Sequence, residues 1–216
     1  MSAALRILPL ALGPFETNTY ILACPATGDC AVVDVGFDPE AVVRRLERER
    51  LTPRLILNTH AHYDHVCGTR AFQRAAGGEY WLHPLDRPLL ERLAQQGSMF
   101  GLPPVEPPED VHELADGQRI ALGAHTLTVI HTPGHSPGSV TFHSGGTLWV
   151  GDVLFAGSIG RTDLPGGSFE VLERTIRTLL FPLGDDQRVL PGHGPETTIG
   201  RERLENPFVG ERARLV

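Results

Sequence analysis

Short runs of apolar residues, separated by glycine, proline and polar residues, recur along the whole chain and predict β-strands. Residues 40–50 follow Pro39 with apolar positions at helical spacing and predict an amphipathic helix. Residues 69–76, which end at two glycines, and residues 169–180 predict two further helices. The expected strands are residues 7–12, 20–23, 31–34, 55–57, 80–82, 120–122, 127–130, 140–142, 148–150 and 188–190.

Strands precede helices in each half of the chain, and this order predicts two sheets packed together with helices outside them. No low-complexity linker interrupts the pattern, so we expect a single domain over residues 1–216. Residues 95–110 are rich in proline and glycine and lack periodicity, which predicts an irregular loop. Loops of this length in compact domains often serve a function, for example as a lid over a site.

Composition narrows the classes of function. The formal net charge of −7 repels the phosphate backbone of nucleic acid on average, so a nucleic-acid partner is not expected. No apolar run approaches the ~20 residues that span a bilayer, so no membrane partner is expected. Arg6 and Pro9 interrupt the first apolar run, which argues against a signal peptide and for a cytoplasmic location. Cys24, Cys30 and Cys67 form no metal-binding CxxC pattern; the first two flank a turn and are expected to be small buried residues.

The segment from Thr59 to His65 concentrates three imidazoles and one carboxylate directly after the predicted strand 55–57. Ligands commonly bind at the carboxyl ends of sheet strands, and neutral imidazole is the commonest metal ligand. His60 and His62 alternate and can converge on one ion, whereas Asp64 and His65 turn toward a second. The segment therefore predicts a metal site.

Three further candidates each follow a predicted strand: His135, Asp152 and His193. A glycine beside each of them allows the sharp turn that directs a side chain back toward the strand ends. Seven candidate ligands exceed what one tetrahedral ion needs. They suit two ions about 3.5–4 Å apart with Asp152 between them.

This series, His60-x-His62-x-Asp64-His65 followed by His135, Asp152 and His193, resembles the metallo-β-lactamase superfamily over nearly the whole chain. The resemblance implies an α/β (α+β) fold, the four-layer αββα sandwich. Within the superfamily, the segments 132–139, 151–155, 159–163 and 206–208 resemble the glyoxalase II (hydroxyacylglutathione hydrolase) branch. The chain ends shortly after the metal segments, like the short, single-domain members of that branch. Many β-lactamases of the superfamily place Cys or His at the position of Asp152, so antibiotic hydrolysis is not expected.

The resemblance implies a hydrolase with two divalent metal ions, Zn being expected first and Fe or Mn being alternatives. Its expected substrate is a small-molecule thioester such as S-D-lactoylglutathione, attacked by a hydroxide that bridges the ions. Asp64 and Asp152 are the expected catalytic residues because they hold those ions. A thiolate leaving group needs little protonation, which favours a thioester over an amide.

Arg161 follows Asp152 in a glycine-rich segment, and two roles are open for it. In the enzymes that the chain resembles, this segment supplies a basic contact to the substrate, so Arg161 is a candidate partner for a substrate carboxylate. The alternative is a structural salt bridge with a nearby carboxylate such as Asp163.

A second reading of the same residues is an oxidoreductase, similar to the persulfide dioxygenases of this superfamily, with one Fe(II) held by two histidines and one aspartate. A hydrolase of nucleic acids would require a basic groove, which the charge does not favour. The sequence does not fix the oligomeric state.

Overall fold

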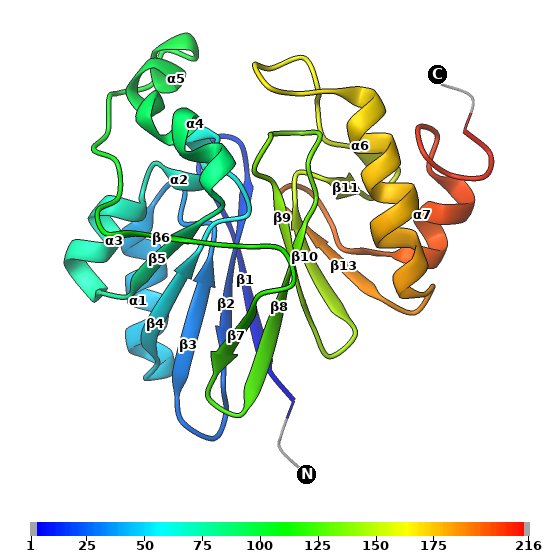
Figure 1. Cartoon of the computed structure of the whole chain (residues 1–216). Coiled ribbons are helices and arrows are strands. Elements are labelled where there is room, and N and C mark those ends of the chain that lie inside the picture. The colour runs from blue at the N-terminus through cyan, green and yellow to red at the C-terminus, as the bar shows by residue number, and fades with distance from the viewer. Residues whose placement is uncertain (1–3, 214–216) are drawn as a thin grey trace.

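Two six-stranded sheets form the centre of the molecule, as the computed structural model, which describes residues 4–213, shows (Figure 1). The first sheet has the order β1-β2-β3-β4-β5-β6, and its strands from β3 onward pair in parallel. The second has the order β14-β13-β10-β9-β8-β7 and is antiparallel except where β10 pairs with β13. A separate two-stranded sheet consists of β11 and β12. The strands are β1 (Arg6–Leu12), β2 (Thr17–Ala23), β3 (Asp29–Val33), β4 (Thr52–Leu57), β5 (Glu79–Leu82), β6 (Val111–Glu113), β7 (Arg119–Leu122), β8 (His125–His131), β9 (Val140–Ser144), β10 (Thr147–Gly151), β11 (Leu154–Phe155), β12 (Ser158–Ile159), β13 (Arg188–Pro191) and β14 (Thr197–Thr198).

Helices cover the outer face of each sheet, so the structure has the expected αββα layers. In Figure 1, α1 and α3 lie outside the first sheet, α6 and α7 lie outside the second, and α4 and α5 lie together at one end. The α-helices are α1 (Pro39–Glu49), α2 (Tyr63–Val66), α3 (Thr69–Ala76), α4 (Arg87–Glu91), α5 (Leu93–Met99), α6 (Phe169–Thr175) and α7 (Ile199–Glu205); a π-helix, Ile176–Leu180, continues α6, and 3₁₀ turns span Pro84–Asp86 and Phe181–Leu183.

Successive residues of a buried strand point to opposite faces, and both faces of each sheet are covered. In β4, Ile56 packs toward the outer helices, whereas its neighbour Leu57 packs into the space between the sheets. Phe142 and Trp149 fill that space from the second sheet. The short apolar runs in the sequence are continuous for this reason, because a strand covered on both sides has no polar face.

The predicted helices agree with the structure within a residue at α1 and fully at α3. The prediction that residues 95–110 are irregular is wrong at its start, because α5 continues to Met99. Only two residues of α5, Leu93 and Gly97, are buried, so a helix this short leaves too few apolar positions for a period to be recognised. Helices α2, α4 and α7 were not predicted either, and all three have fewer than eight residues.

The prediction for the first two cysteines is confirmed. Cys24 and Cys30 are buried, and Cys67 is partly exposed, all three as free thiols. Across the hairpin, Cys30 pairs with Ala23 rather than with Cys24. Among residues 4–213, no helix is long and apolar enough to cross a membrane.

The two sheets are joined at the start of β2 and the end of β13. The Asn18 side chain donates hydrogen bonds to the carbonyl oxygens of Pro191 (3.0 Å) and Gly194 (2.9 Å), and its backbone N–H donates to Gly192 O (2.7 Å). The Tyr20 hydroxyl also donates to Pro191 O. These bonds fix the end of β13 against the first sheet, beside the candidate metal ligands.

Candidate metal centre

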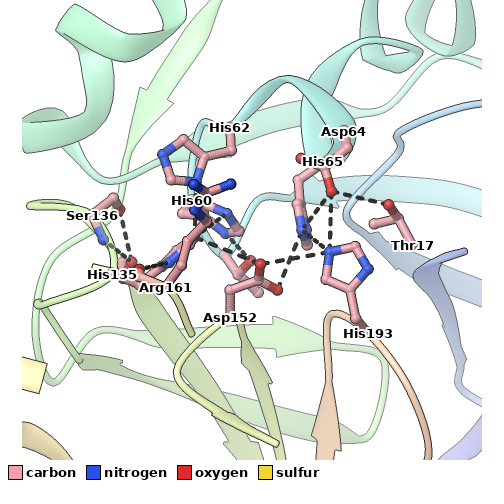
Figure 2. A network of polar contacts seen from close by, with 12 residues as sticks. Thr17, His60, His62, Asp64, His65, His135, Ser136, Asp152, Arg161 and His193 are labelled. Carbon is pink, nitrogen blue, oxygen red and sulfur yellow. Dashed lines mark hydrogen bonds and ion pairs between the residues drawn. The ribbon is translucent and has the colours of Figure 1, made fainter. Parts of the chain in front are cut away.

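His60, His62 and His135 form a first triad at the ends of strands from both sheets (Figure 2). His62 Nδ1 lies 2.8 Å from His135 Nε2, which lies 3.2 Å from His60 Nε2. All three residues are buried, with at most 7% of the surface of any one exposed. These three ring nitrogens face one another at short distances, an arrangement that suits a shared cation.

Asp64, His65 and His193 form a second triad. His193 Nε2 lies 3.1 Å from Asp64 Oδ2 and 3.3 Å from His65 Nε2. Asp64 and His65 lie on the short helix α2, and His193 lies in the turn after β13. The Thr17 hydroxyl donates a hydrogen bond to Asp64 Oδ2 and holds this carboxylate toward the triad.

Asp152 lies between the two triads, as Figure 2 shows. Its Oδ2 is 3.6 Å from His135 Nε2 in the first triad, and its Oδ1 is 3.4 Å from His65 Nε2 in the second. Oδ1 is buried without a hydrogen-bond partner among the described residues. A buried carboxylate oxygen without a donor is costly, so its surroundings call for a positive charge.

Glycines let the chain approach this carboxylate. Gly151, just before Asp152, has φ +52°, a conformation that favours glycine, at the irregularity where β10 pairs with β13. Gly192 packs so closely that a Cβ atom on it would lie 2.2 Å from Asp152 Oδ1. Gly151 thus adopts the turn conformation expected beside Asp152, and Gly192 allows the chain to approach the Asp152 carboxylate closely.

Hydrogen bonds on the far side of the rings orient the histidines. His135 Nδ1 donates to Arg161 O (2.7 Å), and His193 Nδ1 donates to Phe15 O (3.0 Å). His65 Nδ1 donates to Asp34 Oδ2 (2.9 Å). Each of these bonds directs Nε2 of the ring toward the triads, which is the orientation that metal-binding histidines commonly have.

Burial and charge set the protonation of the cluster. Burial, together with the nearby His135, lowers the pKa of His62 to about 3, and burial also lowers that of His60. Both rings are therefore neutral at pH 7. Burial acts to lower the pKa of His65 too, but Asp64 and Asp152 outweigh it and raise that pKa. A proton on His65 thus balances two carboxylates, a role that a bound cation would take over.

The two triads fit divalent cations. They offer imidazole nitrogens and carboxylate oxygens only, and they place Asp152 where it faces both sets. That these seven residues bind metal stays a prediction; the structure brings all of them together. A third group, formed by Asp34 with His60 and His65, is a weaker candidate. The Asp34 carboxylate already accepts from Thr59 N, Thr59 Oγ1 and His65 Nδ1, which makes it a support of His65.

Asp86 supports the first triad and was missed by sequence reasoning. It is fully buried and accepts hydrogen bonds from Ala61 N (2.9 Å), Ser136 Oγ (2.7 Å) and Gly138 N (2.6 Å). Burial raises the pKa of its carboxyl, and these three donors act against that rise. Asp86 thereby connects the loop of His60 and His62 to the loop of His135.

A cavity of about 470 Å³ opens over the triads and is bordered by Phe15, Phe100, Phe155 and Leu164. Its volume is in the range of small-molecule sites, which are mostly apolar with a few convergent polar groups. Gln96 and Phe100 also border it, so the segment 95–110, expected to serve a function, contributes to the site.

Arg161 borders the same cavity, but its guanidinium makes two 2.7 Å hydrogen bonds to the Asp163 carboxylate. Both side chains are more than half exposed. Of the two roles predicted for Arg161, the structure contains the salt bridge with Asp163, and its contact with a substrate stays a prediction.

Known proteins resemble this chain over most of its length. The family model "Metallo-beta-lactamase superfamily" matches residues 12–193. The hydroxyacylglutathione hydrolase GloC of Haemophilus influenzae is 37% identical over 86% of this chain and 89% of its own. The probable metallo-hydrolase YqgX of Bacillus subtilis is 35% identical, over 92% and 94%.

Solved structures are similar to this chain as well. TTHA1623, crystallised in a di-iron-bound form, is 39% identical with a TM-score of 0.86, covering 93% of this chain and 99% of its own. The B3 metallo-beta-lactamase BLEG-1 is 40% identical with a TM-score of 0.86, covering 94% and 99%. By its sequence, its layers and the order of its histidines and aspartates, this chain belongs to the metallo-β-lactamase superfamily.

Proposed function

We propose that this protein is a dinuclear metal-dependent hydrolase of small-molecule thioesters, with glutathione thioesters such as S-D-lactoylglutathione among its substrates. The observation that carries the proposal is the position of Asp152 at the floor of the cavity, between the two triads. Its Oδ1 lies near His65 of the second triad, and its Oδ2 lies near both His135 of the first triad and His193 of the second. Similarity to GloC supports the choice of thioesters.

The metal is proposed to be held by His60, His62 and His135 on one side and by Asp64, His65 and His193 on the other, with Asp152 shared. Two such ions would polarise a carbonyl oxygen and lower the pKa of a water molecule toward ~7. Zinc is the first expectation, and the di-iron form of TTHA1623 makes iron the second.

The residues of the chain would prepare the reaction in three ways. Neutral His60 and His62 present lone pairs at pH 7 because burial keeps them unprotonated. Phe15 and Phe155 exclude water from the cavity and bind apolar parts of the substrate. Thr17, through its hydrogen bond, keeps the Asp64 carboxylate directed at the second triad. A thiolate can leave without being protonated first. The cavity therefore does not need an additional acidic group to protonate the leaving group.

The test combines elemental analysis with thiol release from S-D-lactoylglutathione on one sample. About two metals per chain with thiol release supports the proposal. About one iron per chain, oxygen uptake with glutathione persulfide and no thiol release would replace it with the dioxygenase. A chromogenic cephalosporin belongs in the same assay because BLEG-1 is described as a β-lactamase. His135→Ala should abolish activity, whereas His112→Ala, at an exposed histidine of β6, should not.

A further inference from the structure

A smaller pocket opens from the main cavity beside His62. Its volume is about 140 Å³, and it shares His62, Gln96, Phe100 and Leu164 with the main cavity. The catalytic assignments do not use this side pocket. It starts at a ligand of the first triad and extends away from the second triad, toward α4 and α5.

Three residues border the side pocket without bordering the main cavity and are apolar: Leu89, Met99 and Pro165. Met99 is 65% exposed and Phe100 is 49% exposed, so α5 presents large apolar side chains to solvent at this point. Concentrated exposed apolar surface beside a site commonly marks a binding surface. Two further polar residues that border the side pocket, Arg92 and Gln95, are exposed as well.

Gln96 holds the wall of the side pocket rigidly against the metal-binding loop. Its amide oxygen accepts from Tyr63 N (3.2 Å), and its amide nitrogen donates to Ala61 O (3.0 Å) and Leu89 O (2.8 Å). Gly97 packs on the Tyr63 ring so closely that a Cβ atom would lie 2.5 Å from it. The side pocket is therefore built on the same frame as the first triad, and its position relative to His62 is fixed.

Size identifies what the side pocket can receive. An apolar protein cavity of about 150 Å³ accommodates benzene. The side pocket is of that order and is far too small for a tripeptide thiol such as glutathione. The part of a thioester that can enter it is the substituent of the acyl group, while the thiol carrier occupies the larger cavity.

We propose that the side pocket binds the apolar substituent of the acyl group, up to a benzene ring or a chain of about five carbons. This proposal rests on the thioester hydrolase proposed above and specifies which acyl groups it should prefer: those with a medium-length aliphatic or an aromatic end. An acyl carbonyl held at the triads directs such a substituent past His62 into the side pocket. Acyl groups that carry only small polar substituents leave it empty.

The experiment measures the equilibrium binding of product acids to the metal-loaded protein by calorimetry, from acetate to octanoate and with phenylacetate. The Kd should fall about fourfold for each added methylene until the side pocket is full, and should then level off. A Kd that does not depend on chain length in the wild-type protein would overturn the proposal.

Two variants change the size of the side pocket in opposite directions. Met99→Trp fills it from an exposed position and should remove the gain with chain length. Leu89→Ala enlarges it and should move the levelling to longer acids. Leu85→Trp is the matched control: it places the same side chain at a residue 53% exposed that borders neither the side pocket nor the main cavity. Full chain-length dependence in Met99→Trp, with an unchanged thermal unfolding midpoint, would contradict the proposal.

Thioester turnover separates this proposal from the one on which it rests. If thioesters are hydrolysed but the Kd of the acids does not depend on chain length, the side pocket is not an acyl site and the proposal of a thioester hydrolase is supported. If chain length governs binding but no thioester is hydrolysed, the side pocket stands as an apolar acid site and the thioesterase fails. Hydrolysis with a kcat/KM that rises along the same acyl series supports both.

Discussion

Replacing Asp86 by alanine tests whether a buried carboxylate positions the two loops of the first triad. The substitution removes the acceptor of two backbone donors, Ala61 N and Gly138 N, and of the Ser136 hydroxyl. The hydroxyl keeps a partner because Ser139 Oγ lies 2.7 Å away. The two backbone N–H groups are left unsatisfied in the interior.

Each unsatisfied donor costs about 1–3 kcal/mol, for a total of about 2–6 kcal/mol. Part of this loss is offset because the carboxylate is itself poorly solvated, as its raised pKa shows. We therefore expect the free energy of unfolding to fall by about 2–4 kcal/mol. For a chain of this size that corresponds to a decrease of about 4–16 °C in Tm.

If Asp86 had only a structural role, its loss would lower stability and leave metal affinity unchanged. The assay therefore also measures metal affinity by competition with a chelator. If Asp86 positions the loops of His62 and His135, affinity should fall about 10–100-fold, as for other residues that orient ligands. Asp86→Asn keeps one acceptor oxygen but turns an amide NH₂ toward one of the donors, so it should recover only part of both losses. Asp186→Ala, at an exposed aspartate, is the control. If Asp86→Ala matches this control in Tm and in affinity, the reasoning is refuted.

Three other predictions concern the centre itself. Asp152→Ala should remove most activity and lower the metal content measured by elemental analysis, because its carboxylate faces both triads; full metal with full turnover would exclude a dinuclear centre. Asp163→Ala should free Arg161 and lower KM for an anionic thioester. Arg161→Ala should instead raise KM and leave the metal content unchanged. If both variants keep the wild-type KM, the salt bridge has only a structural role. Gly192→Ala should displace the Asp152 carboxylate and weaken metal binding in a chelator titration, since its Cβ would lie 2.2 Å from Oδ1; wild-type affinity would show that the loop yields freely.

The residues brought together at the centre could be predicted from sequence because each follows a short apolar strand. Asp152 and His193 follow the parallel neighbours β10 and β13, so they meet at one edge of the second sheet. His60 follows β4 of the first sheet, and the packing of the two sheets places this strand end beside them. The layers were predictable for a related reason, since strands buried on both faces are continuous in apolar residues.

The supporting residues could not be predicted in this way. Asp34 contacts His65 from 31 positions away, and Asp86 contacts Ser136 across 50 positions, with no motif to connect them. The sequence offered one indication of Asp34: it is a charged residue at the end of the apolar run 31–34. An aspartate at such a place is buried only if it has hydrogen-bond partners. Helix α5 depends on Gln96 and Gly97 packing on the metal-binding loop, a tertiary contact that leaves no periodic pattern.

The bonds between Asn18 and the end of β13 place residues from opposite ends of the chain around one centre. In the second triad, His65 and His193 are 128 positions apart. An ion held by both would act as a reversible cross-link that closes most of the chain into a loop, and the entropy that such a link removes from the unfolded state grows with loop length. Metal removal should therefore lower hydrogen-exchange protection in β2 and β13 together, so that the two sheets lose stability as one cooperative unit.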